Sequence, residues 1–281
     1  MKYVAVDGGL GNQMFQYAFL LALRHKGHKV QIIETNVNYE HEAGFELDRL
    51  FGIIIPPLYT CWTLLINKLP FPFRRIFSLT HKPFTDLNFR YVPDAINEAA
   101  NYGFFYGTWQ SSKYFDDIQN EVRNAFQFDS QHLSATTLNV KNMLLESNAV
   151  SVHIRRGDYL SATFKDGFGT CCPLDYYRRA IDHIKITVKN PLFIFFSDDM
   201  DWVRENLKVD NAIYVDHNLG LDSWQDMYLM TQCKHNIIAN STFSWWGAWL
   251  NENQNKIVIA PKRWWSTVEK DDVVPNNWIR L

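Results

Sequence analysis

The stretch AVSVHIRRGDY, residues 149–159, indicates the fold class of this 281-residue chain. Its first half is a short apolar run typical of a buried β-strand, and its second half crowds charged side chains where that strand ends. The adjacent guanidinium groups of Arg155 and Arg156 are costly at the end of an apolar strand unless they meet an anion. Two interpretations stay open: the arginines bind a phosphate group of a ligand, or they form an ion-pair knot with Asp158 that holds the turn.

Strands and helices alternate on both sides of this stretch. Downstream, strands are expected at residues 149–153, 192–197, 213–215, 236–239 and 257–260, with helices at 174–189, 201–207, 223–234 and 243–250. Upstream, a strand at 3–6, a helix at 12–23 and a strand at 30–33 form a βαβ unit. Residues 36–147 show a clear pattern only for two helices, at 115–126 and 132–147. This alternation predicts parallel sheets covered by helices on both faces.

We therefore predict an α/β protein with two Rossmann-like, doubly wound domains that face a cleft. The first domain comprises residues 1–147, with an irregular insertion at about 40–110, and the second comprises residues 148–265. Residues 266–281 are expected to form a C-terminal tail. Ligands of open α/β sheets bind outside the carboxyl ends of the strands, so the residues that follow each strand are the candidates for a site.

Composition excludes several classes of protein. With 47% hydrophobic, 15% aromatic and 21% charged residues, the chain is a globular protein with a large core rather than a disordered, collagenous or coiled-coil one. A net charge of −2 argues against nucleic-acid binding, which usually needs a strongly basic domain. The four cysteines (Cys61, Cys171, Cys172 and Cys233) match no zinc-binding pattern, and we interpret them as thiols that are buried or have no functional role. Asp7 interrupts any signal-peptide core, so a cytoplasmic location is expected.

The segment from Phe51 to Arg90 is basic and aromatic. It contains five Lys or Arg residues against one acid, with eight aromatic residues among them. The segment either packs on its own domain or rests on an anionic membrane surface, such as the inner membrane. Its charge-free part is too short for a spanning helix and is broken by Pro56 and Pro57.

The stretch GGLGNQMFQYAF, residues 8–19, follows the first strand and opens a helix. Glycines there let the backbone approach a ligand, and the N–H groups of a helix N-terminus suit a phosphate. Met14 stands where a dinucleotide-binding fingerprint has its third glycine, although Glu34 lies where a ribose-binding acid belongs. A tight structural turn and a ligand-facing loop both remain open.

The stretch FFSDDMD, residues 195–201, also follows a strand. Its acids either cap the next helix or, through Asp198, accept hydrogen bonds from the N–H edge of a purine. Asp199 and Asp201 also match the D-x-D pattern of metal-dependent sugar transferases, although the position at a helix start favours capping.

The stretch ANSTFSWWGAWL, residues 239–250, places Ser241 and Thr242 at the start of a helix, where hydroxyl and backbone N–H groups converge on an anion. Its tryptophans cover more than one helix face, so most are expected in the core. An arginine pair and this helix start on neighbouring strands can hold opposite sides of one diphosphate.

These four stretches resemble the α-1,2-fucosyltransferases of glycosyltransferase family 11 in their short bacterial form. HIRRGDY, residues 153–159, is the most specific of them. The resemblance implies a GT-B fold, GDP-β-L-fucose as donor, a β-galactoside acceptor, inversion at the anomeric carbon, and no metal or other cofactor. It also implies that the first domain lies on the acceptor side and that the second binds GDP-fucose.

The resemblance assigns roles to particular residues. Arg155 would bind the diphosphate, with His153 beside the nucleotide and Asp198 on guanine. The full set of expected GDP-fucose contacts is Gly9, Gly11, Asn12, His153, Arg155, Arg156, Asp198, Asn240, Ser241 and Thr242. The expected catalytic residues are His153, Arg155 and Asp158.

The implied reaction moves L-fucose to the 2-hydroxyl group of a terminal galactose. Asp158 is the candidate general base, and an ion-pair partner of the arginines is the equally weighted alternative; Glu46 is the reserve candidate. Two other functions stay open: an NAD-type oxidoreductase, which rests on the glycine loop and Glu34, and a non-catalytic glycan-binding protein that uses its tryptophans.

Overall fold

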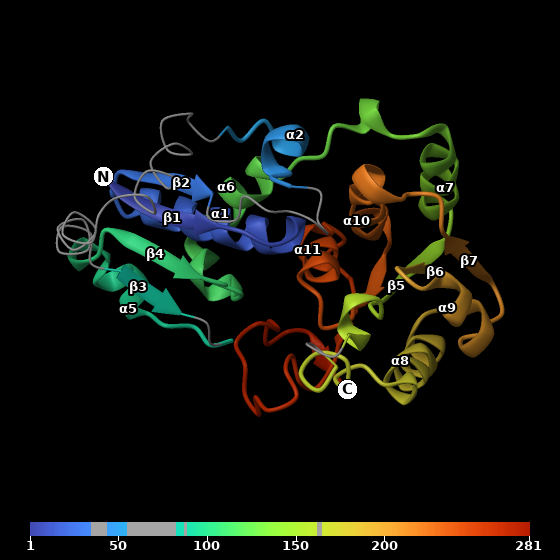
Figure 1. Ribbon diagram of the computed structural model, residues 1–281. Helices are drawn as coiled ribbons and strands as arrows, with labels where there is room; N and C mark the ends of the chain where they lie inside the picture. The colour runs from blue at the N-terminus through green and yellow to red at the C-terminus, as the bar shows by residue number, and fades with distance from the viewer. Residues whose placement is uncertain (35–43, 55–82, 87–88, 162–164) are drawn as a thin grey trace. The chain divides into compact units, whose positions relative to one another are not determined.

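The computed structural model describes residues 1–34, 44–54, 83–86, 89–161 and 165–281 (Figure 1). The chain forms two compact units, Met1–Phe128 and Asp129–Leu281. Each unit is built around its own parallel sheet, as the alternation of strands and helices predicts.

Unit 1 contains a four-stranded sheet in the order β2-β1-β4-β3. Its elements are β1 (Lys2–Val6), α1 (Leu10–His25), β2 (Val30–Glu34), α2 (Leu47–Phe51), β3 (Pro83–Asp86), α5 (Asp94–Asn97), β4 (Phe104–Gly107) and α6 (Gln119–Ala125), with 3-10 turns at Ala99–Asn101, Ser112–Tyr114 and Asp116–Ile118. The expected βαβ unit is confirmed by β1, α1 and β2. Strands β3 and β4 were not predicted, because each is four residues long and lies in a region without clear periodicity.

Helix α1 is buried because its sequence is apolar on nearly every face. Phe19 of this helix is fully buried and stacks on Trp109, with ring centroids 4.0 Å apart. The edges of Phe105 and Tyr114 pack against the same two rings. This aromatic cluster ties α1 to the segment after β4.

Unit 2 contains a six-stranded sheet in the order β10-β9-β8-β5-β6-β7. Its elements are α7 (Ala135–Leu145), β5 (Asn148–Ile154), α8 (Leu174–Thr187), β6 (Pro191–Ser197), α9 (Met200–Asn206), β7 (Ala212–Val215), α10 (Trp224–Gln232), β8 (His235–Ile237), α11 (Thr242–Leu250), β9 (Val258–Ala260) and β10 (Ile279–Arg280), with 3-10 turns at Ser130–His132, Asp158–Leu160 and Gly220–Asp222. The predicted strands and helices downstream of residue 147 are confirmed within a few residues at each end.

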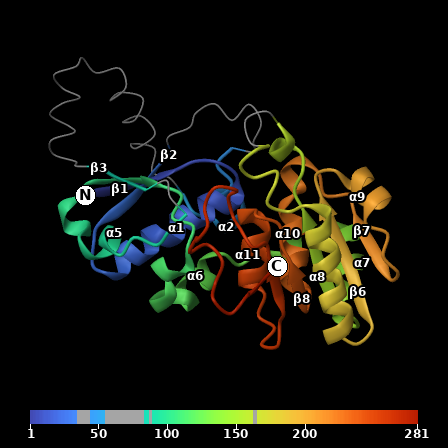
Figure 2. The same cartoon turned by 90° about the horizontal axis from the view of Figure 1, so that it is seen from below.

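Helices cover both faces of the unit 2 sheet (Figures 1 and 2). On one face, Tyr176, Tyr177 and Ile181 of α8 and Val203 of α9 pack on the buried side chains of β5 and β6. On the other face, α10 packs against both α7 and α11. The central strand β5 is therefore buried on both sides, which explains its continuous apolar run.

The units divide earlier than the boundary predicted at residues 147 and 148. Helix α7 belongs with unit 2 because it packs on α10. The predicted tail is also part of unit 2, since Ile279 pairs with Ile259, and Arg280 with Ala260, in a parallel ladder. Arg280 also forms two hydrogen bonds of 2.8 and 2.9 Å with the carboxylate of Asp271.

Most of the basic aromatic segment 51–90, including Cys61, lies outside the described residues. Within the described part of the chain, no helix has both the length and the apolar character needed to cross a bilayer. The predicted cytoplasmic location and the predicted contact with an inner membrane stay predictions.

Candidate functional site

The strands of unit 2 follow one another as in a dinucleotide-binding fold. Read in chain order, β5 to β10 have the spatial order 3-2-1-4-5-6 of a Rossmann sheet. This order reverses between β5 and β8, which are paired neighbours. Ligands of such sheets bind outside the carboxyl ends of the strands at this switch point. The loops that leave there are the HIRRGDY turn and the segment that leads into α11, so the two stretches predicted to hold a diphosphate share one edge of the sheet.

Asp198, at the end of β6, holds the HIRRGDY turn in place. Its Oδ1 accepts the backbone N–H of Arg156 at 2.9 Å, and its Oδ2 accepts that of Gly157 at 3.1 Å. Oδ2 also lies 3.2 Å from Nε of Arg155. A Cβ atom on Gly157 would lie 2.8 Å from Oδ2, so the turn needs glycine for this close approach. The structure therefore gives Asp198 a structural role beside its predicted contact with guanine.

The two arginines form the ion pairs that the sequence left open. Nε of Arg155 lies 2.9 Å from Oδ1 of Asp158, and Nε of Arg156 lies 2.9 Å from Oδ2 of Asp199. The Arg156 guanidinium also stacks over the ring of Trp202, 3.8 Å from its centroid. In the side chain of each arginine, only Nε bonds to another described residue. These bonds hold the guanidinium group in position, and its two terminal nitrogens remain available to an anion.

Tyr159 connects the two loops at the switch point. Its hydroxyl group donates a hydrogen bond of 2.9 Å to the carbonyl oxygen of Asn240, directly before α11. The Arg155 guanidinium lies 5.8 Å from its ring centroid, and its ring stacks on Phe168. Burial raises the pKa of Tyr159, so the hydroxyl group remains a donor at neutral pH. No role was predicted for Tyr159 from the sequence, although this residue is the last of the most specific motif.

Asn240 is buried, and its side chain is fully used within the protein. Nδ2 donates to the carbonyl oxygens of Phe168 and Trp264, both at 3.1 Å, and Oδ1 lies 3.2 Å from Sγ of Cys172. The residue is 2% exposed. These three segments occupy the amide group, and the predicted contact of Asn240 with GDP-fucose stays a prediction.

The start of α11 presents an anion-binding geometry. Ser241 occupies the N-cap position without a capping hydrogen bond from its side chain, and Thr242 is the first helical residue. The N–H groups of the first turn therefore lie at the carboxyl edge of β8. The tryptophans of this helix belong to the core, as predicted: Trp245 and Trp246 are fully buried, and Trp249 is 6% exposed.

His153 is a buried neutral imidazole at the end of β5. It is 6% exposed and lies against Phe243, with ring centroids 5.8 Å apart. Burial, followed by the positive charge of Arg155, lowers its pKa to about 3. Its Nδ1 has no hydrogen-bond partner within the described part of the chain. His153 can therefore offer one neutral donor or acceptor to a ligand at this edge, but it carries no charge at neutral pH.

The acids after β6 cap a helix. Oδ1 of Asp199 accepts the backbone N–H of Trp202 at 3.3 Å, which makes Asp199 the N-cap of α9. Asp201 is fully exposed and lies 3.7 Å from Arg204. Among the described residues, no group of three or more His, Cys, Asp or Glu side chains is arranged to hold a metal ion. The expected metal independence stays a prediction.

Asp226 is a titratable group that the sequence analysis missed. It lies in the first turn of α10, where Nδ2 of Asn218 donates to its Oδ1 at 2.8 Å. Burial raises its pKa to about 7, with a further contribution from the charge of Asp216. Its position in the first turn of the helix that leads into β8 could have indicated it as a candidate site residue.

The glycine loop of unit 1 folds tightly over the start of α1. Gly8 has a left-handed φ of +71°, and a Cβ atom there would lie 2.7 Å from Nδ2 of Asn12. Gly9 is the N-cap residue with open space around it, whereas Gly11 is buried in the first helical turn. Oδ1 of Asn12 accepts a hydrogen bond of 3.1 Å from Gln110. The predicted contacts of these residues with GDP-fucose stay predictions.

Glu46, the reserve candidate for the base, is buried and already paired. It is 6% exposed, and its carboxylate lies 3.1 Å from Nη2 of Arg49. Its backbone N–H donates to Oε1 of Gln13. These contacts hold α2 next to α1, so the structure shows a structural role.

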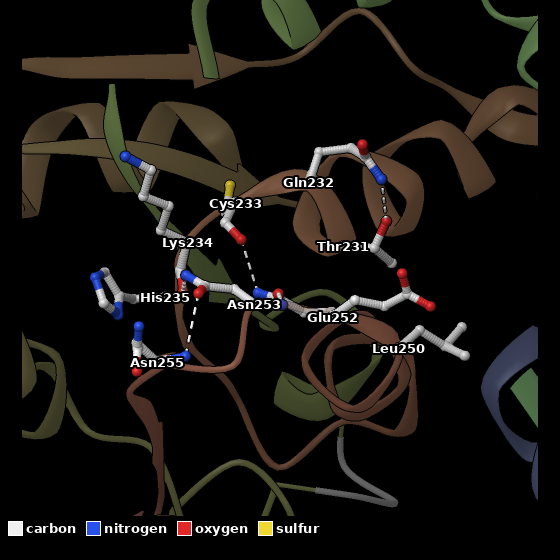
Figure 3. A pocket seen from close by; sticks show the side chains of 10 residues that line it. Thr231, Gln232, Cys233, Lys234, His235, Leu250, Glu252, Asn253 and Asn255 are labelled. Carbon is white, nitrogen blue, oxygen red and sulfur yellow. Dashed lines mark hydrogen bonds between the residues drawn. The ribbon is translucent and has the colours of Figure 1, made fainter. Parts of the chain in front are cut away.

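A pocket of about 580 Å³ lies away from the predicted site (Figure 3). It opens at the amino end of β8, where Oδ1 of Asn148 accepts from Lys234 and Nδ1 of His235 accepts from the backbone of Ile257. The lining residues are Thr231, Gln232, Cys233, Lys234, His235, Leu250, Asn251, Glu252, Asn253 and Asn255. Its position at the edge opposite the switch-point loops excludes it from that site.

Two Rossmann-like units with a ligand edge of this kind define a protein of the GT-B fold class. The crystal structure of the Se-Met fucosyltransferase NodZ from Bradyrhizobium superposes with a TM-score of 0.52 at 14% identity, covering 87% of this chain and 90% of that one. This likeness confirms the predicted fold class.

The chain belongs to glycosyl transferase family 11, which it matches over residues 1–281. The O-antigen biosynthesis glycosyltransferase WbnK of Escherichia coli is 32% identical, covering 99% of this chain and 100% of the relative. The alpha-1,2-colitosyltransferase of Escherichia coli is also 32% identical, covering 98% of this chain and 96% of the relative. The resemblance seen in the sequence is thereby confirmed, and the oxidoreductase and non-catalytic alternatives are set aside.

Proposed function

We propose that this family 11 glycosyltransferase moves L-fucose from GDP-β-L-fucose to the 2-hydroxyl group of a terminal galactose, forming an α-1,2 linkage with inversion and without a metal ion. One observation carries the proposal. The available guanidinium nitrogens of Arg155 and Arg156 and the free N–H groups of α11 lie on the two loops of one switch point. Such an arrangement suits a diphosphate that departs as negative charge builds on it.

The enzyme would accelerate the reaction by stabilising the leaving group. In a transition state with oxocarbenium character, charge develops on GDP, and preorganised donors stabilise that charge more than they stabilise the bound substrate. The ion pairs of Arg155 with Asp158 and of Arg156 with Asp199 hold the guanidinium groups in place before the donor arrives. Tyr159 keeps the two loops in register through its bond to Asn240.

Two carboxylates are candidates for guanine recognition. Both oxygens of Asp198 already accept backbone N–H groups, whereas Asp226 is bonded only through Oδ1 among the described residues. Each carboxylate oxygen can accept two hydrogen bonds, and Asp226 keeps more of these acceptor positions unoccupied than Asp198 does. This difference favours Asp226 and leaves Asp198 as the residue that positions the arginine turn. Comparing GDP affinity in Asp226→Asn and Asp198→Asn separates the two roles.

A second donor deserves a test, because a colitosyltransferase is 32% identical over nearly the whole chain. Colitose is L-fucose without its 3-hydroxyl group, so one polar contact at that position decides between the donors. An enzyme that hydrogen-bonds the 3-hydroxyl group rejects the deoxy sugar strongly, because its own polar group is left unpaired.

The experiment is incubation of the full chain with GDP-fucose or GDP-colitose and a panel of β-galactosides, with linkage and anomeric configuration read by NMR. The proposal expects an α-1,2-fucosylated galactoside. Transfer from GDP-colitose alone would show that GDP-colitose is the donor instead. A product with another linkage would show that a different hydroxyl group accepts the sugar. No product from either donor would overturn the proposal.

A further inference from the structure

The sheet of unit 1 has a switch point of its own. Its order β2-β1-β4-β3 reverses between β1 and β4, which pair in parallel through Tyr3 with Phe104 and Val4 with Phe105. The rule that places ligands at the carboxyl ends of such strands applies here as well. Asp7 directly follows β1, and Tyr106 is the penultimate residue of β4. These two side chains therefore lie at the ligand edge of the unit 1 sheet.

A buried glutamine fixes the orientation of Asp7. Gln16 of α1 is 3% exposed; its Nε2 donates to Oδ1 of Asp7 at 2.9 Å, and its Oε1 accepts the backbone N–H of Asp7 at 3.0 Å. Nε2 also reaches the carbonyl oxygen of Gly107, at the end of β4. The same glutamine thus connects both strands of the switch point and leaves the carboxylate half-buried at their edge.

The carboxylate of Asp7 has neutral partners. The negative charge of Asp7, followed by burial, raises the pKa of Tyr106, which keeps the Tyr106 hydroxyl group protonated beside this carboxylate. Within the described ranges, Asp7 forms no ion pair, in contrast to Glu46 with Arg49 on the neighbouring helix. Tyr106 is 36% exposed, so its ring and hydroxyl group remain accessible.

This chemistry selects the kind of ligand. A negative charge without a cationic partner repels a phosphate group, so the Asp7 carboxylate does not suit the diphosphate of the donor. A carboxylate is a strong acceptor for hydroxyl groups, and a tyrosine ring offers an apolar face together with a polar end. Neutral sugars combine hydroxyl groups with an apolar face, and they match both side chains.

We propose that Asp7 and Tyr106 form the binding site for the terminal galactose of the acceptor glycan. Asp7 accepts a hydrogen bond from a sugar hydroxyl group, and Tyr106 contacts the ring of the same sugar. Gln16 is a positioning residue that acts through Asp7. The inference rests on the proposed function and deepens it by naming residues for the acceptor in unit 1.

The test compares Asp7→Asn, Tyr106→Phe and the control Asp117→Asn. Asp117 is an exposed acid of the same unit whose one ion pair among the described residues is with Lys26, at 3.4 Å. Asparagine can still accept from Gln16, so Asp7→Asn is expected to fold with an unchanged melting temperature. Its KM for methyl β-galactoside should rise about tenfold or more, because a hydrogen bond to a charged group is lost. The KM for GDP-fucose and the Kd for GDP should stay unchanged, and Asp117→Asn should behave as wild type.

Deoxy sugars separate a direct contact from a structural role. Wild type should bind one of the 3-, 4- and 6-deoxy β-galactosides about tenfold more weakly than the parent sugar, whereas Asp7→Asn should not distinguish that pair. Equal discrimination by wild type and Asp7→Asn would show that Asp7 does not touch the sugar. An acceptor KM unchanged in both Asp7→Asn and Tyr106→Phe would overturn the site.

Direct binding keeps this test independent of turnover. Saturation-transfer NMR with methyl β-galactoside and the full chain should show binding in wild type and loss of signal in Asp7→Asn. Binding without transfer from any donor would contradict the proposed function and leave the sugar site standing. Absence of binding to wild type would overturn the site itself.

Discussion

The carboxylate of Asp198, at the end of β6, accepts the backbone N–H of Arg156 at 2.9 Å in the turn after β5. One side chain thereby fixes the turn that carries both arginines. The pairing of β5 with β6 runs from Asn148 and Pro191 to Ile154 and Ser197, so it ends directly at this contact. The geometry of the turn that carries the arginines thus depends on a strand more than 40 residues later in the chain.

Replacing Asp198 with alanine should release this turn. The change leaves the N–H groups of Arg156 and Gly157 unpaired, and each unpaired buried group costs about 1–3 kcal/mol, less where water reaches it. GDP affinity and thermal stability should both fall, with partial rescue in Asp198→Asn, which keeps one acceptor. Gly157→Ala should weaken GDP binding in the same way, because its Cβ would lie 2.8 Å from the carboxylate. Calorimetric titration with GDP checks this, and wild-type affinity in Asp198→Ala would refute it.

Arg155→Ala should nearly abolish transfer while the fold stays intact. Loss of one donor to a developing negative charge lowers the rate on the order of 10²–10³-fold. The matched control is Arg179→Ala on α8, whose arginine forms an exposed pair with Asp175 at 2.9 Å. Initial rates with GDP-fucose and a galactoside provide the measurement. Near-normal turnover of Arg155→Ala would remove it from the site.

Asp158→Asn tests the predicted general base. Because Oδ1 of Asp158 is bonded to Nε of Arg155, we expect a positioning role and a fall in kcat of less than about tenfold. A base in hydrogen-bond reach of the acceptor would contribute about 10²–10⁴-fold instead. The pH profile of kcat distinguishes the two, since loss of a base removes its acidic limb. A hundredfold decrease with a flattened profile would restore Asp158 as the base.

Asp226 should make stability depend on pH. Its pKa is raised to about 7 in the folded chain, so between about pH 4 and 7 the folded form holds a proton that the unfolded form has lost. Stability contributed by this group therefore falls as pH rises through that range. The difference in free energy of unfolding between Asp226→Asn and wild type should shift in favour of the variant by about 1 kcal/mol or more from pH 5.5 to pH 8. Urea unfolding at pH 5.5 and pH 8 provides the measurement, and Asp222→Asn, at an exposed acid, is the control. A stability difference between Asp226→Asn and wild type that does not change with pH would contradict the raised pKa of Asp226.

Chelation should leave transfer unchanged. Asp199 is paired with Arg156 and caps α9, and Asp201 is exposed beside Arg204, so the D-x-D pattern is used by the protein itself. The check is the rate of fucosyl transfer after dialysis against EDTA. A loss of activity that Mn²⁺ restores would show that the two acids hold a metal during turnover.

The alternation of strands and helices after residue 147 and the positions of the polar turns could be predicted from the sequence alone. These features are local, because the periodicity of apolar residues and the residues that start a helix act within one or two turns of chain. The assignment of Trp245 and Trp246 to the core came from the same kind of signal. Family membership, too, was visible in HIRRGDY and its companion stretches.

Which loops lie next to one another became known from the three-dimensional fold and not from the sequence. The sequence does not state that β5 lies between β6 and β8, or that β4 pairs with β1 across about 100 residues of chain. Such pairings depend on the register between strands and on the burial of whole layers. The pattern of neighbouring residues does not determine either feature. For the same reason, the partners of the buried Asn240 side chain were not predicted: Phe168, Cys172 and Trp264 come from segments distant in sequence. Local chemistry places polar groups at the ends of strands, and long-range packing selects which of them remain available to a ligand.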